Sequence, residues 1–153
     1  MRVRNIFRKQ IRLVFLNLYK LINKNGRFVF INFEDRSFNP YIEEFFKELS
    51  KFGDFNKFAA SFSEFNQLCV KELEAAKFVK SNIISKKLEY TISDSSEWWT
   101  ILSGTAFKGI LNNLNNKEQE QFKELHLKKV DNMIKNGLKT YQINIMIGIF
   151  RKA

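Results

Sequence analysis

Apolar residues recur every three or four positions over the first 22 residues. The positions that would share one face of a helix are Val3, Phe7, Ile11, Val14, Leu18 and Leu21. A different face carries Arg4, Arg8 and Arg12 at steps of four. Asn25-Gly26 then favours a turn, because both residues tolerate a positive φ. The pattern predicts that residues 1–26 form a basic amphipathic helix and a turn, packed on a sheet.

Three segments are rich in β-branched and aromatic residues and are predicted strands. The first, Arg27–Phe33 (RFVFINF), is almost continuously apolar, which is typical of a strand covered on both faces. The second covers residues 78–92, and the third covers residues 140–150. The turn and capping residues between these segments delimit predicted helices over residues 41–52, 63–77, 98–111 and 116–135.

Two of the predicted helices contain a residue of a type that often takes part in catalysis. The third helix would bury Phe65, Leu68, Cys69 and Leu73, so Cys69 is expected to be a core thiol. The last helix is expected to begin with a capping box from Asn116 to Gln119. Its mixed face would be Phe122, Leu125, Lys129 and Asn132, which leaves His126 solvated or half-buried.

Composition excludes several classes of protein. The chain has 153 residues with one cysteine and one histidine, which rules out a disulfide scaffold, a cysteine-based zinc site and a multi-histidine metal site. Hydrophobic residues make up 44%, which is too many for a disordered chain. At this length a single domain is expected.

The net charge of +10 is concentrated at the N-terminus. Residues 1–27 contain eight basic side chains and no acidic ones, whereas residues 28–153 are nearly neutral. Such a segment could bind nucleic acid or a membrane surface weakly, but no nucleic-acid recognition motif accompanies it. Nucleic acid is therefore not the expected partner. A transit peptide is disfavoured because the segment is poor in serine and leads straight into a strand, so a cytoplasmic protein is expected.

Two stretches resemble the C-terminal half of class I S-adenosylmethionine-dependent methyltransferases. FLNLYKLINKNGRFVFINF (residues 15–33) is similar to the family's helix, turn and fifth strand, with Asn25-Gly26 where the family has Pro-Gly. Residues 97–152 are similar to the end of the family: the helix EWWTILSGTAFKGIL, the helix KEQEQFKELHLKKVDNMI and a strand ending IGIFRK. The resemblance implies a partial Rossmann-like α/β fold (α+β as a fragment) in one domain over residues 1–153, with residues 27–153 as the acceptor-side half.

The sequence departs from this family at the cofactor site. The family holds S-adenosylmethionine with a glycine-rich loop after its first strand and an acid after its second. This chain has no such loop, and its six glycines are scattered. The resemblance therefore implies a truncated methyltransferase that does not bind S-adenosylmethionine by itself and is inactive alone. Methyl transfer would need a complementary N-terminal half.

The resemblance also implies a three-stranded sheet with an open edge. The last strand would lie in the middle, antiparallel to both neighbours, and Arg27–Phe33 would lie at the edge. A bare apolar strand edge invites pairing with another chain. The expected partner is a complementary N-terminal half, or a second copy, paired along Arg27–Phe33. A non-catalytic interaction module that uses this edge is the alternative function.

Two groups of residues are candidates for binding a small-molecule acceptor. Glu34, Asp35 and Arg36 follow the first strand, and ligands collect at the carboxyl ends of strands in α/β folds. The alternative for them is a solvated turn. Trp98 and Trp99 lie where the resemblance places an acceptor wall. The alternative is that one tryptophan is core and the other a partly exposed cover, since adjacent helical residues cannot both face the core.

Overall fold

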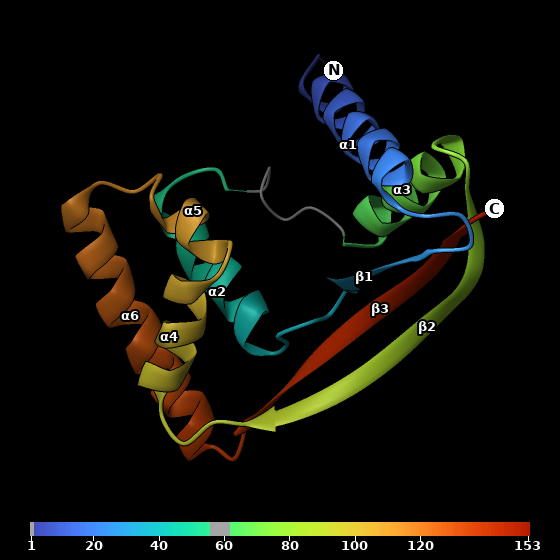
Figure 1. Cartoon of the computed structure of the whole chain (residues 1–153). Helices are drawn as coiled ribbons and strands as arrows, with labels where there is room; N and C mark the ends of the chain where they lie inside the picture. Colours follow the sequence, from blue (N-terminus) through green and yellow to red (C-terminus); the bar gives the residue numbers. More distant parts are fainter. Residues whose placement is uncertain (1, 56–61) are drawn as a thin grey trace. The chain divides into compact units, whose positions relative to one another are not determined.

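The computed structural model describes residues 2–55 and 62–153, with the side chains of the first helix described from Lys9 onward. It has a mixed α/β fold, as predicted. The elements in chain order are α1 (Arg2–Leu21), β1 (Arg27–Phe33), α2 (Tyr41–Leu49), the 3₁₀ turn η1 (Ser50–Phe52), α3 (Phe62–Ala75), β2 (Phe78–Thr91), α4 (Ser95–Gly104), α5 (Phe107–Leu111), α6 (Asn116–Lys135) and β3 (Thr140–Lys152) (Figure 1).

The three strands form one open antiparallel sheet in the order β1-β3-β2. The last strand of the chain therefore lies in the middle of the sheet, which confirms the predicted order and direction (Figure 1). In the register between β1 and β3, Val29 lies opposite Ile149 and Ile31 lies opposite Ile147. Since directly opposed residues share a face, these four β-branched side chains lie on one face of the sheet.

The chain divides into two compact units. The first contains α1, β1 and α3, with β2 as far as Lys87 and β3 from Asn144 onward. The second contains α2, α4, α5 and α6, with the remaining parts of β2 and β3. The expectation of a single domain over residues 1–153 stays a prediction.

In the first unit, α1 and α3 lie side by side on the same face of the strands (Figure 1). Their buried residues form a core with the strands, consisting of Phe15, Cys69, Leu73, Ala76, Phe78 and Phe150. The predicted inward face of α1 was wrong at Val14 and Leu21, which are 56% and 79% exposed, whereas Leu18 packs against the core as predicted. The helix has four consecutive apolar residues from Leu13, and it turns Phe15 inward because this ring packs edge-on against Phe28 at 6.0 Å.

Strand β1 is covered on one face only, which corrects the expectation of a strand buried on both. The rings of Phe28 and Phe30 pack with the core of the first unit. The alternate residues Val29 and Ile31 are 51% and 64% exposed. This follows because α1 and α3 pack on the same face, and no other helix belongs to this unit within the described residues.

The second unit is built around aromatic side chains. Its largest fully buried residues are Trp98, Tyr41, Phe45, Phe122, Leu49 and Leu102, contributed by α2, α4 and α6. Several predicted boundaries in this unit differ from the structure. The helix predicted over residues 98–111 is two helices, α4 and α5, which are separated at Thr105 and Ala106. The capping box of α6 begins one residue earlier than predicted, with Asn115 and Glu118 exchanging their hydrogen bonds.

Candidate functional site

Polar side chains gather in the first unit where β1 ends. Asn66 of α3 is buried and donates its amide N–H to the carbonyl oxygen of Phe33 at 3.0 Å. Its side-chain oxygen accepts a hydrogen bond from Asn32 at 2.7 Å. The buried amide thus has both a donor and an acceptor partner, which offsets the cost of burying it. These bonds hold the start of α3 against the carboxyl end of β1.

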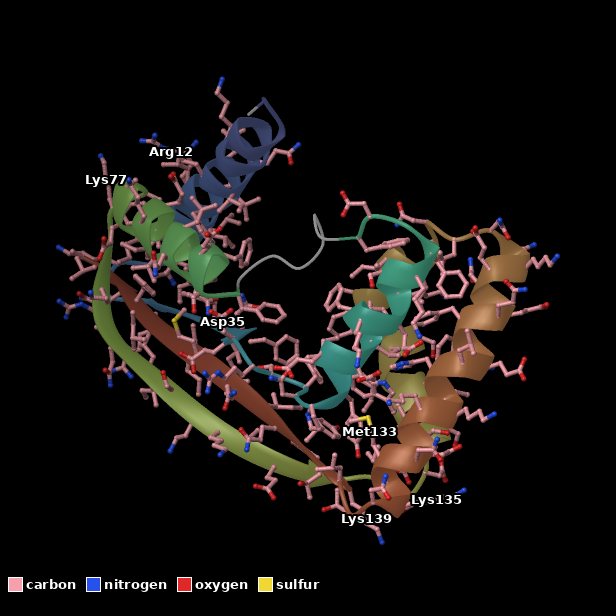
Figure 2. All side chains as sticks on the ribbon, turned by 180° about the vertical axis from the view of Figure 1, so that it is seen from behind. Arg12, Asp35, Lys77, Met133, Lys135 and Lys139 are labelled. Carbon is pink, nitrogen blue, oxygen red and sulfur yellow. The ribbon has the colours of Figure 1, made fainter. Side chains whose placement is uncertain are left out.

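The two acids that follow β1 are each held by the first unit. The carboxylate of Asp35 accepts a hydrogen bond from the backbone N–H of Ser63 at 3.2 Å, in the first turn of α3. Figure 2 shows Asp35 beside the beginning of this helix. Glu34 is half-buried, and its carboxylate accepts a hydrogen bond from the hydroxyl of Ser85 at 2.9 Å. Both carboxylates therefore have a hydrogen-bond partner in the first unit, although Asp35 itself is exposed at the start of a turn.

A hollow of about 370 Å³ lies beside Glu34 in the first unit. Its polar lining comes from Glu34, Asn66, Lys71 and Glu74, together with Ser63 and Gln67. Its apolar lining is Val70, Ile83 and Met146. A volume of this order suits a small organic molecule. The hollow can hold a ligand with an apolar body and a polar end directed at the carboxylate of Glu34.

Arg36 directly follows the two acids and lies in a turn. It belongs to the second unit, is exposed, and has a positive φ of 66°. Its carbonyl oxygen accepts a hydrogen bond from the N–H of Asn39 at 3.3 Å, as in a turn. The described contacts of Arg36 are those of a turn residue, and a role in binding an acceptor stays a prediction.

Trp98 and Trp99 have different environments in the second unit. Trp98 is fully buried, and its indole N–H donates to Nε2 of His126 at 2.9 Å. Trp99 is half-buried, and the amine of Lys123 lies 5.2 Å from the centre of its ring. One tryptophan is thus core and the other is a partial cover. Contact of either ring with an acceptor stays a prediction.

The burial of His126 corrects the prediction of a solvated or half-buried side chain. The face of α6 that packs inward consists of Phe122, His126, Val130 and Ile134, whereas Leu125 is exposed. Burial lowers the pKa of His126 to about 4, although the negative charge of nearby Glu48 acts in the opposite direction. The imidazole is therefore neutral at pH 7. Because its Nε2 accepts from Trp98, its proton lies on Nδ1.

The thiol of Cys69 lies in the core of the first unit. Cys69 is buried, and burial raises the pKa of its thiol to about 11, so it is not a thiolate nucleophile at neutral pH. This confirms its prediction as a core thiol.

In the described residues, no cluster of histidine, cysteine, aspartate and glutamate could hold a metal ion. None of the described helices is both long enough and apolar enough to cross a bilayer.

The basic face of α1 is partly engaged within the chain. The guanidinium of Arg12 lies 3.9 Å from the carboxylate of Glu72, which belongs to α3 and is buried. Figure 2 shows Arg12 on α1 beside α3. This arginine therefore stabilises the packing of two helices, in addition to contributing to the positive charge of the N-terminal segment.

No family model matches the sequence of this chain, and a search of curated proteins finds no match. The geometry of the first unit is consequently the main support for any function.

Proposed function

We propose that residues 1–153 are the acceptor-side part of a class I S-adenosylmethionine-dependent methyltransferase fold, and that they are inactive by themselves. The sheet order supports this proposal most directly. A last strand that lies between the other two, antiparallel to both, is the arrangement that the sequence resemblance implies. It also leaves β1 at the edge, where the strands of the cofactor-binding half would continue the sheet.

The placement of the described glycines supports assigning S-adenosylmethionine to another part of the fold. A backbone cradle for this cofactor needs glycines in a loop between a strand and a helix. Gly104 lies in α4, Gly109 in α5 and Gly148 within β3. Gly137 follows the end of α6 with a φ of 90°, as expected of a helix C-cap. We therefore assign cofactor binding to residues outside this chain and derive no step of methyl transfer through it.

The part assigned to this chain is acceptor binding. The hollow beside Glu34 has the size for a small molecule. The carboxylate of Glu34 is held in place by a hydrogen bond from the hydroxyl of Ser85. A fixed carboxylate beside an apolar wall would orient an acceptor through a hydrogen bond or an ion pair. Fixing the acceptor in this way favours in-line attack on a methyl group by proximity and orientation.

Isothermal titration calorimetry with S-adenosylmethionine tests the assignment of cofactor binding. The purified chain should give no binding heat with the cofactor up to millimolar concentration. A parallel titration of an intact class I methyltransferase shows that the cofactor stock is competent. Micromolar binding by residues 1–153 alone would contradict the proposal, because it would require a complete cofactor site within this chain.

A non-catalytic interaction module is the second candidate function. The observation that favours it is the open edge of β1, next to the exposed side chains of Val29 and Ile31. The two functions differ in a measurable way. A methyltransferase part gains activity when the cofactor-binding half is supplied in trans, whereas an interaction module gains a partner but no methyl transfer.

A further inference from the structure

We propose that this chain forms a homodimer in which β1 pairs antiparallel with β1 of a second copy, with Val29 of each copy opposite Ile31 of the other. This inference does not depend on methyltransferase ancestry. It uses the same edge that a complementary half would occupy, so the homodimer and that complex would exclude each other.

The backbone of β1 shows which groups face the open edge. The N–H of Glu34 donates to the carbonyl oxygen of Asn144 at 2.7 Å, and the N–H of Lys152 donates to that of Gly26 at 2.9 Å. In an antiparallel ladder the residues that bond to the neighbouring strand alternate with residues that point away. The even-numbered residues of β1 thus face β3, and the backbone groups of Val29 and Ile31 face the open edge.

Three of the usual protections against pairing are missing from the described part of this edge. Natural edge strands are blunted by proline, by a bulge or by charged side chains. The segment from Phe28 to Phe33 contains no proline and no charged residue, and its register with β3 is continuous. Among the described residues, β3 is the only strand that pairs with β1. Asn66 is bonded to the carbonyl oxygen of Phe33, so the most accessible part of the edge lies before that residue.

The register follows from the side chains. Residues that face the edge can pair only with residues that face the edge of the second copy. If Val29 lies opposite Ile31, the two symmetric pairs place β-branched side chains together on the same face. The apolar stripe of Val29, Ile31, Ile147 and Ile149, in which Val29 and Ile31 are exposed and the other two half-buried, then continues from one copy into the other. Shifting the register by two residues would place Ile31 opposite Arg27 in one direction and Val29 opposite Phe33 in the other, so only the proposed register places both Val29 and Ile31 opposite β-branched residues.

Charge complementarity supports the second copy as the occupant. β1 begins with the exposed cation Arg27 and is followed by the exposed anion Asp35. In the proposed register, Arg27 lies opposite Phe33 of the second copy and diagonal to its Asp35. Diagonal neighbours across a strand pair are within reach of a long side chain. The two-fold symmetry creates this opposite-charge pair twice.

Sedimentation velocity of the full chain over a range of concentrations tests the proposal. The wild type should show a concentration-dependent dimer, and Ile31→Lys should raise its dissociation constant about tenfold or more, because two lysines would face an apolar partner strand. Leu21→Lys is the matched control, since it places the same charge on an exposed leucine of α1. A wild type that stays monomeric at millimolar concentration, or an Ile31→Lys variant that dimerises as well as the control, would overturn the proposal.

A charge-swap experiment tests the register independently of the apolar stripe. Arg27→Glu and Asp35→Lys should each weaken the homodimer, because each places like charges together in both symmetric pairs. An equimolar mixture of the two variants should form a heterodimer with about the wild-type affinity, since both pairs are then of opposite charge. Circular dichroism of each variant checks that it is folded. Two folded variants that dimerise no better when mixed than when separate would refute this register.

Discussion

The indole N–H of Trp98 donates a hydrogen bond to Nε2 of His126 at 2.9 Å within the buried core of the second unit. The imidazole ring is stacked on Phe122, with 5.3 Å between ring centres, and Phe45 meets it edge-on at 5.7 Å. Its Nδ1 has no hydrogen-bond partner among the described residues. The core of this unit is thus organised around one neutral histidine.

We expect acid to destabilise this unit through His126. Its folded pKa of about 4 lies below the ordinary value of 6.5, so the unfolded chain binds more protons between these two values. The contribution is fully present above pH 6.5, and stability falls as the pH is lowered from 6.5 towards 4. At about 1.4 kcal/mol per pKa unit, the loss amounts to about 3 kcal/mol.

Urea unfolding followed by tryptophan fluorescence between pH 4 and pH 7.5 measures this loss. The control is His126→Phe, which keeps an aromatic ring in the stack but cannot take up a proton. The variant should be less stable at pH 7 because the N–H of Trp98 loses its acceptor. Its stability should nevertheless depend less on pH over this range. Equal pH dependence in the two proteins would show that His126 is not the group responsible.

The adjacent tryptophans should respond very differently to truncation. Trp98→Ala should cost about 3–5 kcal/mol, because it opens a cavity in the core and leaves His126 without its donor. Trp99 is half-buried and lies beneath the amine of Lys123, so Trp99→Ala should cost clearly less, about 1–2 kcal/mol. Chemical unfolding of the two variants under the same conditions makes the comparison. Similar losses would contradict the division between a core tryptophan and a cover.

The strands could be predicted from sequence because their composition is distinctive. The bounds of β1 are those of the segment Arg27–Phe33, where β-branched and aromatic residues lie between a turn and two acids. The inward faces of helices were harder to predict. In α6, Leu125 is the more hydrophobic residue and His126 is the buried one, because Trp98, which is 28 positions away, supplies the hydrogen bond that burial requires.

The candidate site was predictable only in part. The end of β1 indicated Glu34 and Asp35, since polar residues that end a strand mark a boundary in any sequence. Asn66 could not be found in this way, because its bonds to Asn32 and Phe33 join positions more than 30 residues apart. Its position within α3 gave no local signal beyond a polar residue on an apolar face. Sequence reasoning also grouped Arg36 with the two acids; the structure shows it as a turn residue with a positive φ of 66°, and its role stays a prediction.

Reaction of the single cysteine should report on unfolding of the first unit. The thiol of Cys69 is buried and its pKa is about 11, so both access and thiolate formation disfavour reaction at pH 8. We expect labelling by a disulfide reagent to be slow in the native protein and fast in concentrated guanidinium chloride. Stopped-flow absorbance gives both rates. Rapid labelling of the native chain would contradict the packing of Cys69 in the core between α1 and the sheet.

Two glycines offer a matched test of how closely β1 and β3 pack. A Cβ atom at Gly148 would lie 2.4 Å from the ring of Phe30, and this ring is itself stacked between Phe28 and Phe150. Gly148→Ala should therefore force the ring aside and cost about 1–3 kcal/mol. At Gly109, in α5, nothing lies within 4 Å of the added atom. Gly109→Ala should stabilise the protein by about 0.5–1 kcal/mol, because alanine is the better helix former.

Thermal or urea unfolding of both variants, with the wild type alongside, gives the two changes in the free energy of unfolding. Opposite signs are expected, since the two substitutions add the same methyl group to a crowded strand and to an open helix. The Gly148→Ala variant should also alter the near-ultraviolet circular dichroism, because the stacked phenylalanine rings of the first unit would be displaced. If both substitutions stabilise the chain equally, then Phe30 does not lie over Gly148 as described, and the register between β1 and β3 would need to be revised.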